Sequence, residues 1–223
     1  MTAPAVGIVT IGQSPRADVV PDIAALLPPG TPVIERGALD GAGPASLARL
    51  APAPGEDVLV SRMRDGTEVT MSEMRLLPLV QDAVDHVTGR GAAVVAVLCT
   101  GTLSRLRCPV PLLQPGPLVR SLVAAAAPGG RLGVLVPSAD QTALVRAEWE
   151  PVAGPVLVLA ASPYGPPGPL SRAAAALAAF GPDLVVLDCL GFDGPMKRTV
   201  AAAVAAPVLL PRTVLAGAIA AFL

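Results

Sequence analysis

Short apolar runs alternate with amphipathic segments along the chain. Several runs, such as "AVVAVL" at 93–98 and "LVVL" at 184–187, are apolar at every position, which is typical of parallel strands covered by helices on both faces. Strands are expected at 5–11, 31–35, 57–64, 67–71, 93–98, 109–113, 131–136, 155–160, 183–188 and 207–210. Helices are expected at 18–27, 44–51, 72–89, 115–127, 139–150, 169–180, 194–205 and 211–222. The alternation predicts βαβ units and a doubly wound α/β sheet.

Turn and cap residues add detail to this plan. Asp65-Gly66 stands between "VLVSRMR" and "TEVTM" and predicts a β-hairpin within 57–71. Arg62 and Arg64 share one side of its first strand, so we expect the hairpin to flank the mouth of a ligand cleft or a dimer contact. Ser72 and Ser138 stand where helix N-caps are expected. "SPYGPPGP" at 162–169 predicts an irregular surface loop.

The chain also repeats itself weakly, with three matched pairs of segments in the same order. The pairs are "VGIVTIG" at 6–12 with "LGVLVPS" at 132–138, "VVAVLCTG" at 94–101 with "LVVLDCLG" at 184–191, and "CPVPLLQPGPLV" at 108–119 with "APVLLPRTVL" at 206–215. The repeat predicts two pseudo-symmetric α/β domains, a first of 1–113 plus 207–223 and a second of 114–206. Ligands of open α/β sheets bind at the carboxyl ends of the strands, so a cleft between the domains is expected.

Composition excludes several classes of partner. The charge is nearly balanced, with 16 basic and 17 acidic residues, and aromatic residues make up 2%, so no nucleic-acid surface is expected. The most apolar stretch, 199–223, is interrupted by prolines and Arg212. Its last apolar run of about 11 residues falls short of the roughly 20 that span a bilayer, so no membrane segment is expected. Three cysteines without a secretory framework or leader peptide predict a reduced, cytoplasmic protein.

Two of the cysteines, Cys99 and Cys189, follow matched apolar runs and precede Gly101 and Gly191. A thiolate can act as a base and a thiol as an acid. Two such groups on opposite faces of a carbon acid can remove a proton from one side and return it on the other, which is cofactor-independent racemisation. We therefore expect both to be catalytic, with sulfurs about 7–10 Å apart so that one carbon lies at near-attack distance from each.

The alternative is that a cysteine fills a core position as a small hydrophobe. That interpretation suits Cys108, which has no counterpart in the repeat, but the matched pair favours chemistry. The single histidine, His86, falls off the apolar face of its helix and is expected to be exposed. Without CxxC, GxGxxG or Walker sequences, we expect neither a metal nor an organic cofactor.

The loop "IGQSPR" at 11–16 follows the first strand and carries three polar side chains. Gln13 offers an amide, Ser14 a hydroxyl and Arg16 a fixed cation whose planar fork suits a carboxylate. A small anionic ligand is therefore expected at this loop. The alternative is that Arg16 braces its own helix through Asp18 or Asp22.

Four stretches resemble the AroM family: "GIVTIGQSPRAD" at 7–18, "GEDVLVSRMRDGTEV" at 55–69, "VLCTGT" at 97–102 and "VLDCLGF" at 186–192. The resemblance extends over essentially the whole chain and implies a relation to the aspartate/glutamate racemase superfamily. That superfamily has two α/β domains around a cleft and works without metals or organic cofactors. It includes racemases of amino acids and hydantoins, maleate isomerase and arylmalonate decarboxylase, and many members use one or both cysteines.

Carried over by position, Cys99 and Cys189 match the catalytic cysteines of the superfamily. Thr100 and Thr102 match polar residues that help to bind a substrate carboxylate. Leu190 stands where the racemases keep a threonine and Asp188 where glycine is common, which departs from the pattern for aspartate or glutamate. The full set of candidate substrate-binding residues is Gln13, Ser14, Arg16, Thr100, Gly101, Thr102, Ser138 and Gly191.

Three functions follow from these residues. The first is a racemase or epimerase acting on a small carboxylate or cyclic amide. The second is a non-catalytic binding or regulatory protein that keeps the same fold. The third is a decarboxylase or lyase that uses one cysteine. A homodimer is compatible with each of them.

Overall fold

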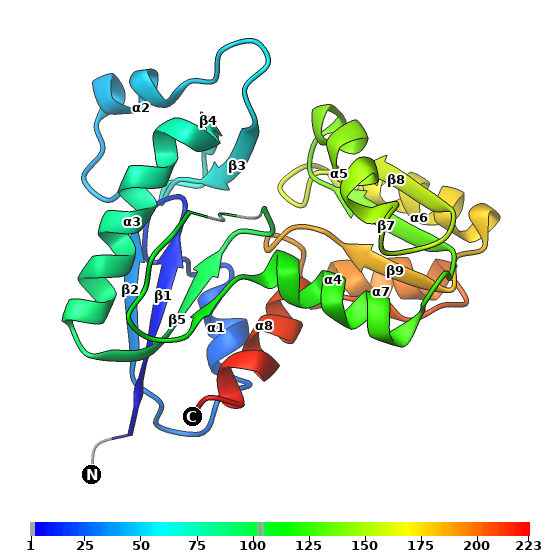
Figure 1. The fold of residues 1–223 in the computed structure, drawn as a ribbon. Helices are drawn as coiled ribbons and strands as arrows, with labels where there is room; N and C mark the ends of the chain where they lie inside the picture. Colours follow the sequence, from blue (N-terminus) through cyan, green and yellow to red (C-terminus); the bar gives the residue numbers. More distant parts are fainter. Residues whose placement is uncertain (1–2, 102, 104) are drawn as a thin grey trace. The chain divides into compact units, whose positions relative to one another are not determined.

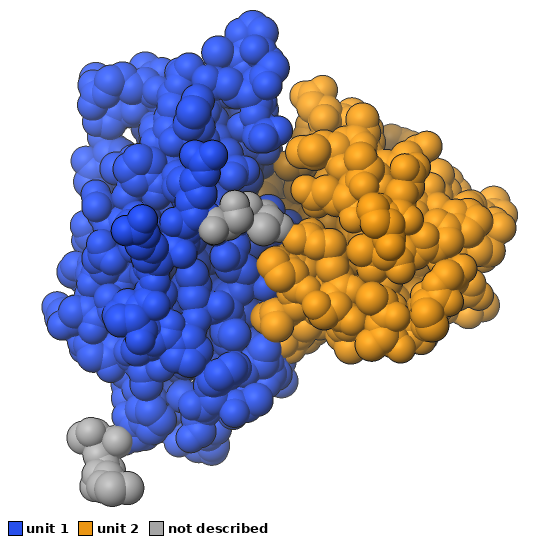
Figure 2. All heavy atoms as spheres, in the orientation of Figure 1, with its two compact units in different colours: residues 1–115, 215–223 blue, residues 116–214 orange. Residues whose placement is uncertain are grey.

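The computed structural model describes residues 3–101, 103 and 105–223. The chain divides into two compact units, 1–115 with 215–223 and 116–214 (Figure 2). Each unit is built on a four-stranded parallel sheet, flanked by helices (Figure 1). The predicted α/β class is therefore confirmed.

The sheet of the first unit has the strand order β2-β1-β5-β6. Its strands are β1 (Ala5–Thr10), β2 (Val33–Gly37), β5 (Ala92–Leu98) and β6 (Leu112–Leu113). The helices of this unit are α1 (Val20–Ala24), α2 (Pro44–Leu50), α3 (Glu73–Gly89) and the last part of α8 (Pro211–Ala220). Helix α3 packs along β1, β2 and β5, and α1 and α8 lie on the other side of the sheet (Figure 1).

The core under α3 is formed by apolar residues that recur at every second position in the strands and at every third or fourth position in the helix. Alternate strand residues, including Val9, Val95 and Val97, point to one face of the sheet. The apolar stripe of α3 meets them with four fully buried side chains, Leu76, Val80, Val84 and Val87. Burying each such side chain contributes about 1.5–3 kcal/mol, so this face is a main source of the unit's stability.

The sheet of the second unit has the strand order β8-β7-β9-β10. Its strands are β7 (Leu132–Val136), β8 (Val156–Ala160), β9 (Leu184–Leu187) and β10 (Val208–Leu209). One core cluster joins the sheet to α4 (Pro115–Ala126) and α5 (Thr142–Trp149), which follows the 3-10 helix η1 (Ala139–Gln141). A second cluster joins it to α6 (Pro167–Phe180) and α7 (Gly194–Ala203).

The weak sequence repeat corresponds to a structural repeat. The first matched segments form β1 and β7, the second form β5 and β9, and the third contain β6 and β10. These strands hold the same places in the two sheet orders. Gly7 of β1 and Gly133 of β7 are also equivalent, because a Cβ at either would lie within 2.7 Å of a side chain of α3 or α6. The chain is therefore built from two pseudo-symmetric halves with the same strand order.

Boundaries differ from expectation in a few places. The expected division at 113/114 and 206/207 falls at 115/116 and 214/215, because β10 pairs with β9 and stays in the second unit. Helix α1 is shorter than the expected 18–27. Ser72 is the N-cap residue of α3, but its side chain makes no capping hydrogen bond. Ser138 does cap η1, accepting from the Asp140 amide.

The hairpin predicted around Asp65-Gly66 is present as β3 (Val58–Arg62) and β4 (Glu68–Ser72), paired antiparallel. Gly66 adopts a φ of 89°, and Asp65 accepts the Thr67 amide, so the turn residues act as their chemistry predicts. Within the described ranges, no helix is long and apolar enough to cross a membrane.

Gly7 is the clearest position at which the fold depends on a missing side chain. A Cβ there would lie 2.7 Å from Val87 Cγ2 and 3.0 Å from Val87 Cβ, and a valine in a helix cannot turn away. Gly7→Ala should therefore lower the free energy of unfolding by about 1–3 kcal/mol in urea titrations.

Gly217→Ala is the matched control, because Gly217 lies in α8 and an added Cβ would have no atom within 4 Å apart from the backbone of its own helix. This change should leave stability unaltered or raise it by up to about 1 kcal/mol. Equal unfolding midpoints for the two variants would contradict the packing argument.

Candidate active site

Both cysteines leave their sheets through the same backbone turn. Cys99 follows β5, and its amide donates to the Val97 carbonyl at 2.9 Å. Cys189 follows Asp188 after β9, and its amide donates to the Leu187 carbonyl at 2.8 Å. The two sites are therefore equivalent in strand, position and local hydrogen bond.

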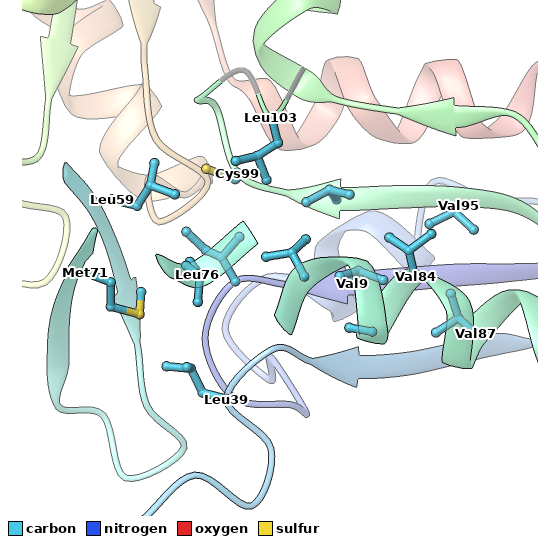
Figure 3. Close-up of a cluster of buried hydrophobic side chains, with 14 of the residues drawn as sticks. Val9, Leu39, Leu59, Met71, Leu76, Val84, Val87, Val95, Cys99 and Leu103 are labelled. Carbon is cyan, nitrogen blue, oxygen red and sulfur yellow. The ribbon is translucent and has the colours of Figure 1, made fainter. Parts of the chain in front are cut away.

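The surroundings of the two sulfurs differ. Cys99 is 8% exposed and belongs to the core cluster that also contains Leu59 and Leu103 (Figure 3). Cys189 is half-buried, and its sulfur accepts the Gly191 N–H at 3.3 Å. An N–H aimed at sulfur favours the thiolate over the thiol. Cys189 thus has a described donor of the kind that acid–base chemistry requires.

The glycine after each cysteine allows close packing. A Cβ on Gly101 would lie 3.1 Å from Leu59 Cδ2 and 3.4 Å from Cys99 Sγ. A Cβ on Gly191 would lie 2.5 Å from the Tyr164 hydroxyl. Neither φ is positive, so these glycines are needed for space and not for backbone freedom.

The loop 11–16 leaves the same sheet edge as Cys99, because Thr10 of β1 pairs with Leu98 of β5. Ser14 is held by Asp40, which accepts its amide at 2.8 Å and its hydroxyl at 2.6 Å. Gln13 donates to the Leu39 carbonyl and accepts the Arg64 amide. Both polar side chains are therefore fixed by neighbouring loops.

Asp40 organises this loop, although no sequence motif singled it out. It also accepts the Gly37 amide at 2.8 Å. Burial raises the pKa of Asp40, but hydrogen bonds from Ser14 and Gly37 and the nearby charge of Arg36 outweigh burial and hold the pKa below its usual value. Its carboxylate is therefore ionised at neutral pH and braces two loops.

Arg16 is buried, at 5% exposed, and its guanidinium forms a fork on Asp18 with distances of 2.8 and 2.9 Å. A third nitrogen donates to Thr10 Oγ1 at 3.3 Å. Burial raises the pKa of Asp18, but the hydrogen bonds and charge of Arg16 outweigh burial and hold it below its usual value. This is the bracing arrangement that the sequence allowed as the alternative to anion binding.

The hairpin packs on the same loop. A Cβ on Gly12 would lie 2.4 Å from the Arg62 carbonyl, and the Arg64 guanidinium donates to the Ser14 carbonyl. The Arg62 guanidinium, in contrast to that of Arg64, donates a hydrogen bond within the hairpin itself, to the Gly66 carbonyl. The hairpin therefore lies over the carboxyl edge of the first sheet, beside the loop that carries the candidate residues.

The remaining candidates are placed less tightly. Thr100 is half-buried directly after Cys99, and Thr102 lies outside the described residues. Ser138 follows β7, the strand next to β9, but its hydroxyl caps η1. His86 is exposed on α3, and Cys108 packs partly against the first unit's core, as expected for both.

Three further side chains near Cys189 were not singled out from the sequence. Tyr164 lies over Gly191, Trp149 Nε1 donates to Asp188 at 3.2 Å, and Arg212 donates to the Leu190 carbonyl. Within the described ranges, no group of three or more His, Cys, Asp or Glu side chains is arranged to hold a metal ion.

Comparison with known proteins shows the family to which the chain belongs. A family model described as "AroM protein" matches residues 6–223. The chain belongs to the AroM family. A search of curated proteins finds no match to it.

Solved structures show which fold this AroM protein has. Allantoin racemase from Klebsiella pneumoniae matches with a TM-score of 0.67 at 12% identity, covering 98% of this chain and 87% of that one. Glutamate racemase isoform RacE1 from Bacillus anthracis matches with a TM-score of 0.65 at 13% identity, covering 99% and 82%. Arylmalonate decarboxylase matches with a TM-score of 0.58 at 20% identity, covering 97% and 92%. The AroM chain thus has the fold of this racemase superfamily.

Asp40→Asn tests the brace under the loop of the AroM protein. Losing the carboxylate should lower the free energy of unfolding by about 1–3 kcal/mol at pH 7. The pKa of Asp40 is lowered on folding, so its contribution is present above its unfolded value of about 3.9 and is lost as pH falls through the folded value. The difference between wild type and variant should therefore shrink below about pH 4 in chemical denaturation.

Asp82→Asn provides the control, because Asp82 is exposed on α3. It should change stability little at any pH. A loss in Asp40→Asn that persists undiminished at pH 3 would show that the ionised carboxylate is not what matters.

Gly191→Ala tests the contact beside Cys189. The new methyl group would meet the Tyr164 hydroxyl at 2.5 Å and Pro163 Cγ at 2.7 Å, so the loop 162–165 must move. We expect a loss of about 1–3 kcal/mol in the free energy of unfolding. Adding Tyr164→Ala should recover part of that loss, giving a non-additive double-mutant cycle.

Gly194→Ala is the control three residues along the chain, at the start of α7, because the nearest atom beyond the backbone of that helix is Arg198 Nη1 at 3.5 Å. It should be tolerated. Strict additivity of Gly191→Ala and Tyr164→Ala would mean that the two residues do not share this contact.

Proposed function

We propose that this AroM protein is a cofactor-independent racemase or epimerase in which Cys99 and Cys189 act on one carbon acid from opposite faces. The observation that carries the proposal is their equivalence. Each comes just after the corresponding strand of its sheet, and each amide makes the same bond to the carbonyl two residues back. A cysteine kept only for packing needs no such counterpart.

In the proposed reaction, the thiolate of one cysteine takes the proton from the substrate's α-carbon. The electron pair left behind is delocalised onto the adjacent carbonyl oxygen of the acid or amide. The thiol of the other cysteine then donates its proton to the opposite face, which inverts the centre. The two sulfurs exchange protonation states in each turnover, so no metal, electron carrier or cosubstrate enters the balance.

The proposed ligand is a small carboxylate or cyclic amide with an acidic C–H. The allantoin and glutamate racemases with the same fold are named for substrates of these two kinds. Leu190 is buried and offers no hydroxyl at the second cysteine. We therefore assign the carboxylate contact to Thr100, whose side chain follows the first cysteine. Arg16, paired with Asp18, is proposed to keep that loop in place.

A one-cysteine decarboxylase is the second candidate, and unequal burial favours it. Cys189 is half-buried with a donor on its sulfur, whereas Cys99 is 8% exposed within a core cluster. In this reaction the bond to a carboxylate breaks with release of carbon dioxide. The electron pair passes to the remaining carbonyl group, and the Cys189 thiol protonates the carbon.

Solvent exchange at Cα separates these candidates. Wild type, Cys99→Ser, Cys189→Ser and Cys108→Ser are incubated in deuterium oxide with single enantiomers of amino acids, hydantoins and 2-aryl or 2-hydroxy acids. Deuterium at Cα is followed by NMR, and configuration by chiral chromatography. The rate of racemisation should fall at least about 100-fold in Cys99→Ser and in Cys189→Ser, because each change removes an acid–base group. Cys108→Ser should behave as wild type.

Other outcomes identify the other functions. Carbon dioxide released from substituted malonates, lost in Cys189→Ser but kept in Cys99→Ser, would replace the racemase proposal with the decarboxylase. Thermal stabilisation by a member of the panel, with no exchange and no carbon dioxide, would identify a binding protein.

A further inference from the structure

Arg212 lies at the second position of α8 and is only 2% exposed. A buried guanidinium requires hydrogen-bond acceptors, because desolvating a charge without them is very costly. Two of its nitrogens, Nε at 3.1 Å and Nη2, donate to the carbonyl oxygen of Leu190. That carbonyl belongs to the residue directly after Cys189.

The peptide group between Leu190 and Gly191 also contacts the sulfur of Cys189, through its N–H. The carbonyl of Leu190 and the N–H of Gly191 form one planar unit. The carbonyl accepts from Arg212, and the N–H donates to Cys189 Sγ at 3.3 Å. A buried cation and a candidate catalytic sulfur are thus linked through a single peptide.

This link has two physical consequences. Two nitrogens on one oxygen fix the plane of the peptide, which keeps the N–H directed at the sulfur. A cation on the carbonyl also polarises the peptide, because hydrogen bonds in a chain strengthen one another. Both effects favour negative charge on the sulfur.

We propose that Arg212 is a positioning residue for Cys189, which stabilises the thiolate through the Leu190–Gly191 peptide. The proposal relies on the proposed function only for what the thiolate is used for. Arg212 makes this contribution without touching the reacting atoms.

The first unit offers a natural contrast. The loop after Cys99 is held by Gln114, which accepts the Leu103 amide at 2.9 Å and donates to the Leu103 carbonyl at 3.2 Å. Gln114 comes directly after β6, and Arg212 comes three residues after β10, at the start of α8, so both anchors lie just beyond the equivalent edge strand. A neutral amide brings no net charge to its loop, whereas Arg212 brings a cation to the loop after Cys189.

Other ionisable groups also lie on elements around this loop. Asp188 precedes the cysteine with its carboxylate on Trp149, and Asp193 caps α7 through the Met196 amide. Tyr164 comes from the loop after β8 and lies over Gly191. The two carboxylates oppose a negative sulfur, which makes the cation behind the peptide more important.

The test measures the rate of Cys189 alkylation by iodoacetamide against pH, in the whole protein, by peptide mass spectrometry. Only the thiolate reacts, so the midpoint of the profile reports its stabilisation. In Arg212→Met the midpoint should rise by roughly one pH unit. Arg212→Lys should shift it less, because it keeps the charge but loses the fork.

Arg131→Met is the matched control in the same unit. Arg131 also donates two nitrogens to the backbone, in its case to the carbonyls of Gly181 and Phe180, but it stands just before β7, at the amino end of the sheet. Its loss should lower stability without moving the Cys189 midpoint. Alkylation of Cys99 should keep the same profile in all three variants.

A wild-type measurement keeps the proposal open to refutation even if an Arg212 variant fails to fold. The NMR shift of the Gly191 amide should titrate with the same midpoint as alkylation of Cys189. An amide that does not follow that titration would overturn the proposal, as would an unchanged midpoint in folded Arg212→Lys and Arg212→Met. No racemisation by wild type, with the midpoint shift intact, would reject only the proposed function.

Discussion

Parallel pairing of β1 with β5, and of β7 with β9, is the constraint on which the candidate site depends. Parallel strands end at the same edge of their sheet, so the chain must leave the sheet there. In both units it leaves through a cysteine whose amide turns back to the carbonyl two residues earlier. Backbone bonds alone therefore deliver each sulfur to the edge where ligands of α/β sheets bind.

Polar groups around the two cysteines are held in different ways. In the first unit, Asp40 and the hairpin fix the loop 11–16, and Arg16 lies buried against Asp18. In the second unit, one arginine and one peptide hold the loop after Cys189. A site built for chemistry needs such support, because misplaced acid–base groups lose much of their effect.

Much of this fold was predictable because the central strands β1, β5, β7 and β9 are buried on both faces. Runs such as 93–98 and 184–187 leave no polar position for a half-exposed strand, and the repeat fixes how the runs correspond. Strands β6 and β10 are shorter than expected because prolines flank them, at 109 and 111 and at 207 and 211, and cannot donate to a ladder.

The contacts that hold the site were harder to predict. Ser14 and Asp40 are 26 residues apart, and Leu190 and Arg212 are 22 apart, so no local pattern joins either pair. Arg212 is the one partial exception, because the sequence alone shows a cation within an apolar helix. Such a cation indicates that a hydrogen-bond acceptor is buried beside it. Arg16 had two compatible roles, and the short reach to Asp18 satisfies its fork within its own loop.

The most direct test of the two-cysteine account is the location of deuterium early in turnover. One enantiomer of a substrate is converted to a few per cent in deuterium oxide, and the isotope is measured in product and in remaining substrate. Two cysteines on opposite faces predict deuterium in the product and almost none in the remaining substrate, because the donated proton comes from the second, solvent-equilibrated thiol. Equal deuterium in both would mean that one group exchanges both faces, which would contradict the account.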